Sequence, residues 1–145
     1  MSPVLDRQDI ERILPHRDPF LFVDEVVELA VGRRVVGVVR TPETGFFLRG
    51  VPSDARYFPP TLLIEAMAQV GAILVLHSKE NQGRTIYFRS IEEAQFHENV
   101  PAGATLRIEG DVRRLRGRMG TLAMKAFLVD APGALLAEGV MSFAL

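Results

Sequence analysis

Glu65 and Gln69 are the residues whose types and spacing point most directly to chemistry. All the remaining residues of the stretch 62–76 are apolar or small. Residues four apart lie on one face of a helix, so the carboxylate and the amide would be neighbours. A carboxylate carried into an apolar setting is costly unless a partner stabilises it. Glu65 is therefore either a hydrogen-bonded structural group or an acid/base residue, with Gln69 bound to it or to a substrate.

The element that would carry this pair is a long helix. A helix that is apolar nearly all round is buried. We expect it to begin at Pro59–Pro60, because proline is tolerated in the first turn, where an amide would lack an intrahelical acceptor. The segment 78–83 ends it. The apolar stretch is shorter than the roughly 20 residues that span a bilayer and contains Glu65, so it predicts a core helix and no membrane partner.

Strand patterns occur on both sides of this helix. Segments rich in Val and Phe, and segments that alternate apolar with polar residues, favour strands. A short helix over 9–14, stopped by Pro15, precedes them, and a loop over 41–57 leads into the long helix. The expected strands are 20–29, 33–40, 85–96, 106–113, 122–129 and 135–145.

Together these elements predict an α+β fold with a single domain over residues 1–145. About six mostly antiparallel strands would form one sheet that curls round the long helix and covers its faces. A chain of 145 residues is long enough to enclose one such core.

Composition excludes several classes of function. Lys plus Arg (17) nearly balances Asp plus Glu (18), so nothing indicates a nucleic-acid partner. The absence of Cys rules out a thiolate nucleophile and Cys-ligated zinc, and fits a reducing, cytoplasmic location. His16, His77 and His97 lack metal-ligand spacing, so no metal is expected. The N-terminal residues show no pattern of a secretion signal.

Two long motifs resemble those of a known family. The segment 14–24, Leu-Pro-His-Arg-Asp-Pro-Phe-Leu-Phe-Val-Asp, is similar to the opening motif of the 3-hydroxyacyl-[acyl-carrier-protein] dehydratases of bacterial fatty-acid synthesis. The segment 63–69, Leu-Ile-Glu-Ala-Met-Ala-Gln, resembles their central-helix motif, and 94–96 and 101–103 are also similar. The resemblance implies the hot-dog fold, in which an antiparallel sheet wraps one long helix and two protomers pair to form the active sites.

The resemblance also implies a reaction. Family members remove water from a 3-hydroxyacyl thioester on a pantetheine arm, so the expected partner is an acyl-carrier protein or a coenzyme A thioester. A His abstracts the C2 proton, and a Glu on the other protomer's helix assists departure of the hydroxyl. Glu65 matches that Glu. No cofactor is implied, and a homodimer or higher homo-oligomer is expected.

Two positions depart from the family's pattern. A catalytic His stands fourteen residues before the Glu in the family, and here that position is Val51, which cannot move a proton. The family's Met-Pro-Gly at the helix start reads Phe58-Pro59-Pro60, and Pro60 has no amide to hold a thioester carbonyl, although the amide of Thr61 is next. Phe58, Pro60, Thr61 and Gln69 are the expected substrate-binding positions.

Three functions follow from this pattern. The first is a dehydratase whose missing His is replaced by Asp54, Tyr57 or His16, of which His16 is favoured as structural because the family keeps a His there too. The second is a non-catalytic hot-dog subunit that binds acyl chains or an active partner. The third is an acyl thioesterase in which Glu65 alone acts as nucleophile or base.

Two further groups of residues have competing interpretations. The basic run 113–118 is either a solvated hairpin tip or a contact for an acidic acyl-carrier protein. The phenylalanines either line an acyl tunnel or belong to the core, and the core is favoured. They are Phe20, Phe22, Phe46, Phe47 and Phe58.

Overall fold

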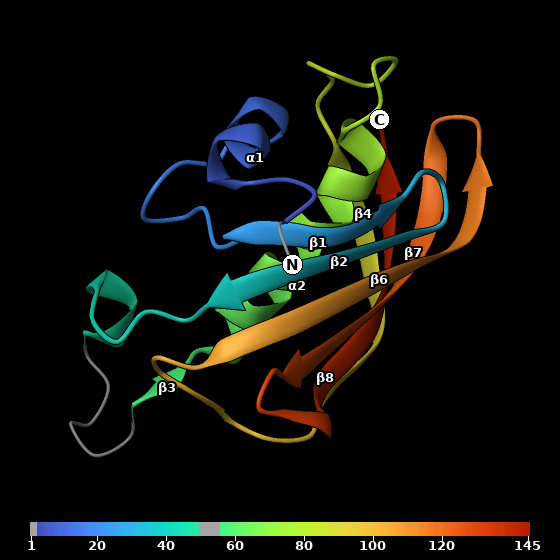
Figure 1. Cartoon of the computed structure of the whole chain (residues 1–145). Helices are drawn as coiled ribbons and strands as arrows, with labels where there is room; N and C mark the ends of the chain where they lie inside the picture. The colour runs from blue at the N-terminus through green and yellow to red at the C-terminus, as the bar shows by residue number, and fades with distance from the viewer. Residues whose placement is uncertain (1–2, 50–55) are drawn as a thin grey trace.

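The computed structural model describes residues 3–49 and 56–145 (Figure 1). In chain order these residues form α1 (Arg7–Ile13), β1 (Glu25–Ala30), β2 (Arg34–Arg40), the 3-10 helix η1 (Phe46–Leu48), β3 (Tyr57–Phe58), α2 (Pro60–Leu76), β4 (Tyr87–Phe96), β5 (Val100–Pro101), β6 (Thr105–Arg116), β7 (Met119–Leu128) and β8 (Ala131–Ala144).

Six of these strands form one antiparallel sheet around α2. Their order is β1-β2-β6-β7-β8-β4, and every neighbouring pair is antiparallel. Figure 1 shows the sheet curving past the helix, with the long strands β6, β7 and β8 beside it. The predicted α+β class, with a curled sheet of about six strands and one long helix, is confirmed.

Close approach of α2 to the sheet depends on small residues. A Cβ added to Gly71 would come within 2.9 Å of Leu122 Cδ1, and one added to Gly37 within 2.8 Å of Val70 Cγ2. Both distances are shorter than real carbon contacts allow, so glycine at these positions lets helix and strands pack directly. The result is a helix whose residues from Ala66 to Leu76 are all buried.

The segment 20–24 differs from the prediction, which placed a strand over 20–29. The strand begins at Glu25, and the residues before it are irregular. The amide of Asp24 donates to the carbonyl of Val38 in β2 at 2.9 Å, but several groups before it bond to side chains or to the preceding turn. Arg7 donates to the carbonyls of Leu21 and Val23, each at 2.9 Å. This segment thus joins the sheet at Asp24, and its residues Leu21, Phe22 and Val23 are buried.

The loop predicted over 41–57 contains structure that the sequence did not indicate. Besides η1, it ends in β3, which pairs with β5 to form a separate two-stranded sheet. Two-residue strands are too short to leave a periodic pattern. The pairing of β3 with β5 joins the start of α2 to the segment that precedes β6.

The core interpretation of the phenylalanines holds for Phe22 and Phe58, which are 5% and 2% exposed. Their rings meet edge-on at 5.5 Å, and each also meets the ring of Phe47. Phe20 is 39% exposed and lies against Phe22. No helix in the described ranges is long and apolar enough to cross a membrane.

Candidate active site around Glu65

Glu65 lies in the second turn of α2 and contacts two polar side chains. Its Oε1 accepts a hydrogen bond from Gln69 Nε2 at 3.0 Å. The same oxygen lies 3.4 Å from Nε2 of His16. The side chains of His16 and Glu65 are 27% and 31% exposed, so the pair is half-buried rather than enclosed. The structure therefore brings together a half-buried carboxyl, a half-buried imidazole and a buried amide.

Gln69 is the buried anchor of this group, with 1% of its surface exposed. Its Oε1 accepts from the amide of Phe22 at 2.9 Å, and its Nε2 donates to the carbonyl of Phe20 at 2.9 Å. The reversed amide orientation would set donor against donor and acceptor against acceptor, so the backbone fixes which end faces Glu65.

This orientation shows which oxygen of Glu65 is hydrogen-bonded within the chain. Because Gln69 presents an N–H to Oε1, that oxygen must act as an acceptor. Oε2 is the oxygen that neither Gln69 nor His16 contacts among the described residues. Oε2 is then the atom that can give a proton to a bound molecule or take one from it.

His16 is positioned by the turn that follows α1. This helix begins with a capping box in which Asp6 and Asp9 each accept the other's backbone amide, and it ends before Leu14. The guanidinium of Arg17 donates to the carbonyls of Leu14 and His16 and so braces the turn. His16 Nδ1 is buried and has no hydrogen-bond partner among the described residues. The ring thus has one nitrogen near Glu65 and one that is unpaired.

The start of α2 holds the other predicted substrate-binding residues. Pro60 and Thr61 are exposed, and the amides of Leu62 and Leu63 both donate to the carbonyl of Pro59 at 3.0 Å. The helix therefore begins with a residue that has no amide, and Thr61 carries the first N–H beyond it. Phe58 packs in the core just before this point.

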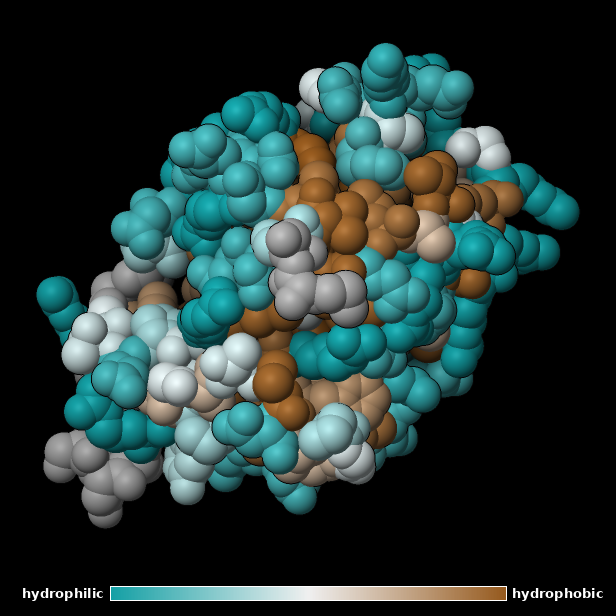
Figure 2. Space-filling view, in the orientation of Figure 1, coloured by the Kyte–Doolittle hydropathy of each residue, from teal (hydrophilic) through white to brown (hydrophobic). Residues whose placement is uncertain are grey.

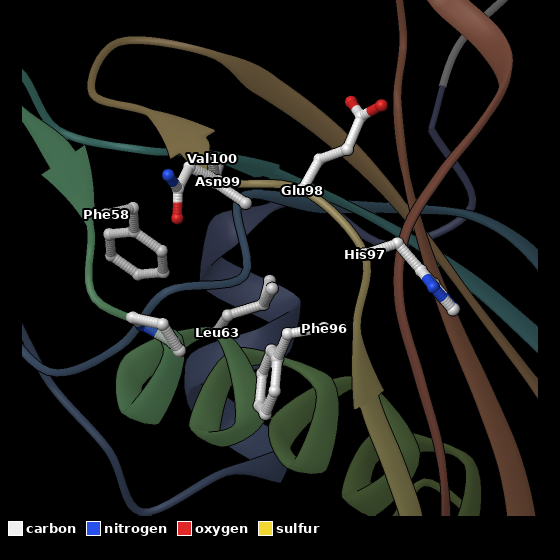
Figure 3. Close-up of a pocket in the computed structure, with 8 residues that line it drawn as sticks. Phe58, Leu63, Phe96, His97, Glu98, Asn99 and Val100 are labelled. Atoms are coloured by element: carbon white, nitrogen blue, oxygen red, sulfur yellow. The ribbon is translucent and has the colours of Figure 1, made fainter.

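A cavity of about 190 Å³ lies beside the same helix terminus (Figure 3). Phe58, Leu63 and Phe96 line it, and Figure 3 shows His97 and Glu98 directed away from it. Leu63 and Glu65 are two residues apart, which places them roughly 200° apart around the helix. Within one chain, this cavity and the Glu65 carboxyl therefore lie on different sides of α2.

Other positions from the sequence do not join the Glu65 group in the described chain. Val51 and Asp54 lie outside the described residues. Tyr57 is 45% exposed on β3, where it pairs with Pro101. The described residues contain no group of three or more His, Asp or Glu side chains suited to a metal ion. His16 was named by its motif, but the contact with Glu65 required the tertiary structure.

Comparison with known proteins agrees with this fold and identifies the family. The FabA-like domain model matches residues 14–141. A protein of Desulforamulus reducens named 3-hydroxyacyl-[acyl-carrier-protein] dehydratase FabZ is 40% identical over 142 residues, which cover 98% of each chain. The protein of the same name from Geobacillus thermodenitrificans is 37% identical, with 98% of this chain and 96% of that protein covered.

Solved structures show the same architecture at lower identity. A chain of the dehydratase heterocomplex ApeI:P from Xenorhabdus doucetiae superposes with a TM-score of 0.77 at 18% identity, covering 99% of this chain and 91% of that one. Cj0977 from Campylobacter jejuni gives 0.69 at 11% identity, covering 99% and 94%. The fold and the helix carboxylate define a hot-dog protein of the FabA-like class. The chain belongs to the family of the 3-hydroxyacyl-[acyl-carrier-protein] dehydratases.

Proposed function

We propose that the protein dehydrates a 3-hydroxyacyl thioester, with Glu65 and His16 as its acid/base pair. The observation that carries the proposal is the 3.4 Å separation of His16 Nε2 and Glu65 Oε1. A dehydratase needs one group to remove a proton and another to supply one, and both must reach the same substrate. Membership of the dehydratase family supports this reaction over others that a lone carboxylate can perform.

The reaction balances on these two side chains. Neutral His16 takes the proton from C2, and the electron pair of that bond forms the C2–C3 double bond. The C3–O bond breaks, and the hydroxyl leaves as water with the proton from Glu65 Oε2. Loss of the acquired proton from His16 to water and uptake of one by Glu65 from water then restore the starting state, since both side chains are partly exposed.

His16 is proposed as the base because the family position of that group reads Val51. Valine carries no titratable group, so a second proton-transfer residue must come from another segment. Among the described residues, His16 is the histidine in contact with Glu65, whereas His97 pairs with Glu138 at 2.9 Å. His16 therefore combines the required chemistry with the required position.

A homodimer is proposed through the edge strand β4. This strand pairs with β8 on one side, and its other edge is unpaired within the six-stranded sheet. Large apolar side chains are exposed along it, with Tyr87 at 64%, Ile91 at 46% and Phe96 at 47%. An edge with exposed apolar residues favours pairing with another strand, and a second copy supplies one with the same pattern.

An acyl-carrier protein is the proposed carrier of the substrate. The hairpin between β6 and β7 exposes four arginines, and none of them has an ion-pair partner among the described residues. Such a cluster attracts an acidic partner and speeds its association. The arginines are Arg113, Arg114, Arg116 and Arg118.

A second candidate is a non-catalytic subunit that binds acyl chains or an active partner. The observation that favours it is Pro60 at the first position of α2, where no backbone N–H is available to hold a thioester carbonyl. Loss of one such donor typically lowers a rate by about 10²–10³. This candidate differs from the first in predicting no turnover at all.

Mass spectrometry of a medium-chain 3-hydroxyacyl pantetheine thioester incubated with the protein tests these functions. The expected result is loss of one water, absent in Glu65→Gln and strongly slowed in His16→Gln. Glu98→Gln, an exposed carboxylate outside the group, is the matched control and should retain activity. Release of free hydroxy acid would instead indicate a thioesterase, and unchanged substrate with every variant would favour the non-catalytic subunit.

A further inference from the structure

An apolar groove lies at the C-terminal end of α2, remote from Glu65. Its volume is about 300 Å³, at the lower end of the range typical of small-molecule sites, roughly 300–1,000 Å³. The end of α2, the β1–β2 turn and the β6–β7 hairpin line it. Figure 2 shows hydrophobic surface gathered above β1, at this end of the helix. Leu74, on its wall, is more than two helical turns from Glu65.

The groove has a buried apolar floor and an exposed apolar mouth. Leu74, Val75 and Phe143 form the floor and are 5%, 8% and 2% exposed. At the mouth, Val31 and Leu115 are 69% and 51% exposed. Apolar surface that stays in contact with water is unfavourable and marks binding sites when it is contiguous and rimmed by polar residues. The proposed dehydration uses none of these residues.

Polar groups at the groove are placed for a ligand with a polar end. Ser78 Oγ is buried and has no hydrogen-bond partner among the described residues. Arg118 lines the mouth and has no ion-pair partner in the described chain. Glu80 also lines the groove. Among the described residues of the lining, Arg118 is the one arginine, which suits a ligand head with a single negative charge.

We propose that this groove binds a medium-chain fatty-acid anion as a site separate from Glu65. The alkyl chain would cover the apolar floor, and the carboxylate would pair with Arg118, whose planar guanidinium matches a carboxylate in two parallel hydrogen bonds. The small volume of the groove excludes long alkyl chains. The groove therefore selects its ligand by chain length as well as by charge.

Isothermal titration calorimetry with octanoate, octanol, octylammonium and octyl phosphate tests the proposal on the intact protein. Octanoate should bind at least about tenfold more tightly than octanol, because only octanoate can pair with Arg118. Octylammonium should bind more weakly than octanol. Octyl phosphate binding more tightly than octanoate would overturn the assignment of a carboxylate ligand, and so would octanol binding as well as octanoate.

Two charge-reversal variants locate the site. Arg118→Glu should weaken octanoate binding at least about tenfold, whereas Arg113→Glu should leave it unchanged. Both arginines are exposed in the same hairpin, but Arg113 does not line the groove. Equal weakening by the two variants would show only a general charge effect and would overturn the proposal. Glu65→Gln should bind octanoate normally, so this test does not depend on the dehydratase reaction.

Discussion

The imidazole of His16 lies 3.4 Å from the carboxyl of Glu65, although the two residues belong to different elements of the fold. His16 follows α1, and Glu65 lies in α2. Gln69 donates a hydrogen bond to the same carboxyl oxygen. A single chain therefore brings together the two titratable groups that the proposed dehydration uses.

Removing either member of this pair should abolish or strongly reduce dehydration. Glu65→Gln keeps the shape of the side chain but cannot transfer a proton, and His16→Gln removes the proposed base. We expect turnover to fall by about 10²–10⁴ in each variant. Quenched time points analysed by mass spectrometry measure the rate. Full activity in His16→Gln would contradict the role of His16, while loss in Glu65→Gln alone would leave Glu65 as the sole catalytic group.

Gln69→Leu should destabilise the protein as well as the site. The substitution leaves the buried amide of Phe22 and the carbonyl of Phe20 without their partner. Each buried group left unpaired costs about 1–3 kcal/mol. The free energy of unfolding, measured by urea denaturation, should fall by at least that amount. Gln82→Leu, at an exposed glutamine, is the control, and an equal loss there would argue against a specific anchor.

Pro60→Gly should raise the dehydration rate. Glycine restores a backbone N–H at the start of α2. This N–H could donate a hydrogen bond to the thioester carbonyl. We expect at least a tenfold gain, within the roughly 10²–10³ that one such donor contributes elsewhere. The added chain flexibility should lower stability by about 0.4–1 kcal/mol. Pro132→Gly, at the exposed start of β8, should leave the rate unchanged. No gain in Pro60→Gly would mean that the carbonyl does not lie at this terminus.

The ion pairs of Glu109 should make the free energy of unfolding depend on pH in the acidic range. Burial acts to raise the pKa of Glu109, but bonds to Arg107 and Arg34, at 2.8 and 3.3 Å, outweigh it and hold the pKa below 4.5. A lowered pKa in the folded state means that the stabilisation is present at neutral pH and is lost as the pH falls through the folded value.

Urea midpoints measured from about pH 6 to about pH 3 check this expectation. Wild type should lose more stability over this range than Glu109→Gln, which has no carboxyl to protonate. Glu11→Gln, at a carboxyl outside the network, should behave like wild type. Parallel curves for wild type and Glu109→Gln would show that this carboxyl does not contribute to the dependence on pH.

Charge placed on β4 should dissociate the proposed dimer. Ile91→Lys puts a cation on the exposed edge strand of each protomer, so two copies would bring like charges together. Light scattering coupled to size exclusion should then report a monomer. Val129→Lys alters a residue of nearly the same exposure, 44% against 46%, in the turn after β7, and should remain dimeric. A dimer in both variants would place the interface elsewhere.

Much of the architecture was predictable because it depends on local patterns. The apolar run 62–76 fixed the long helix, and Pro59–Pro60 fixed its start. Alternation and turn residues located the six strands of the main sheet. The first strand was predicted to start at Phe20, but it starts at Glu25, because Gln69 and Arg7 bind the backbone before it. Such long-range side-chain bonds leave no periodic signal.

The sequence by itself determined the helix, the strands and the shared helix face of Glu65 and Gln69, since all of these depend on spacing within one element. Only the tertiary structure decided which residue meets Glu65. The motif containing His16 is one of two long motifs in the chain, but their contact arises from the packing of the turn after α1 on α2. The orientation of Gln69 was also a tertiary result, because backbone groups from a distant segment hold its amide and thereby leave Oε2 of Glu65 free for chemistry.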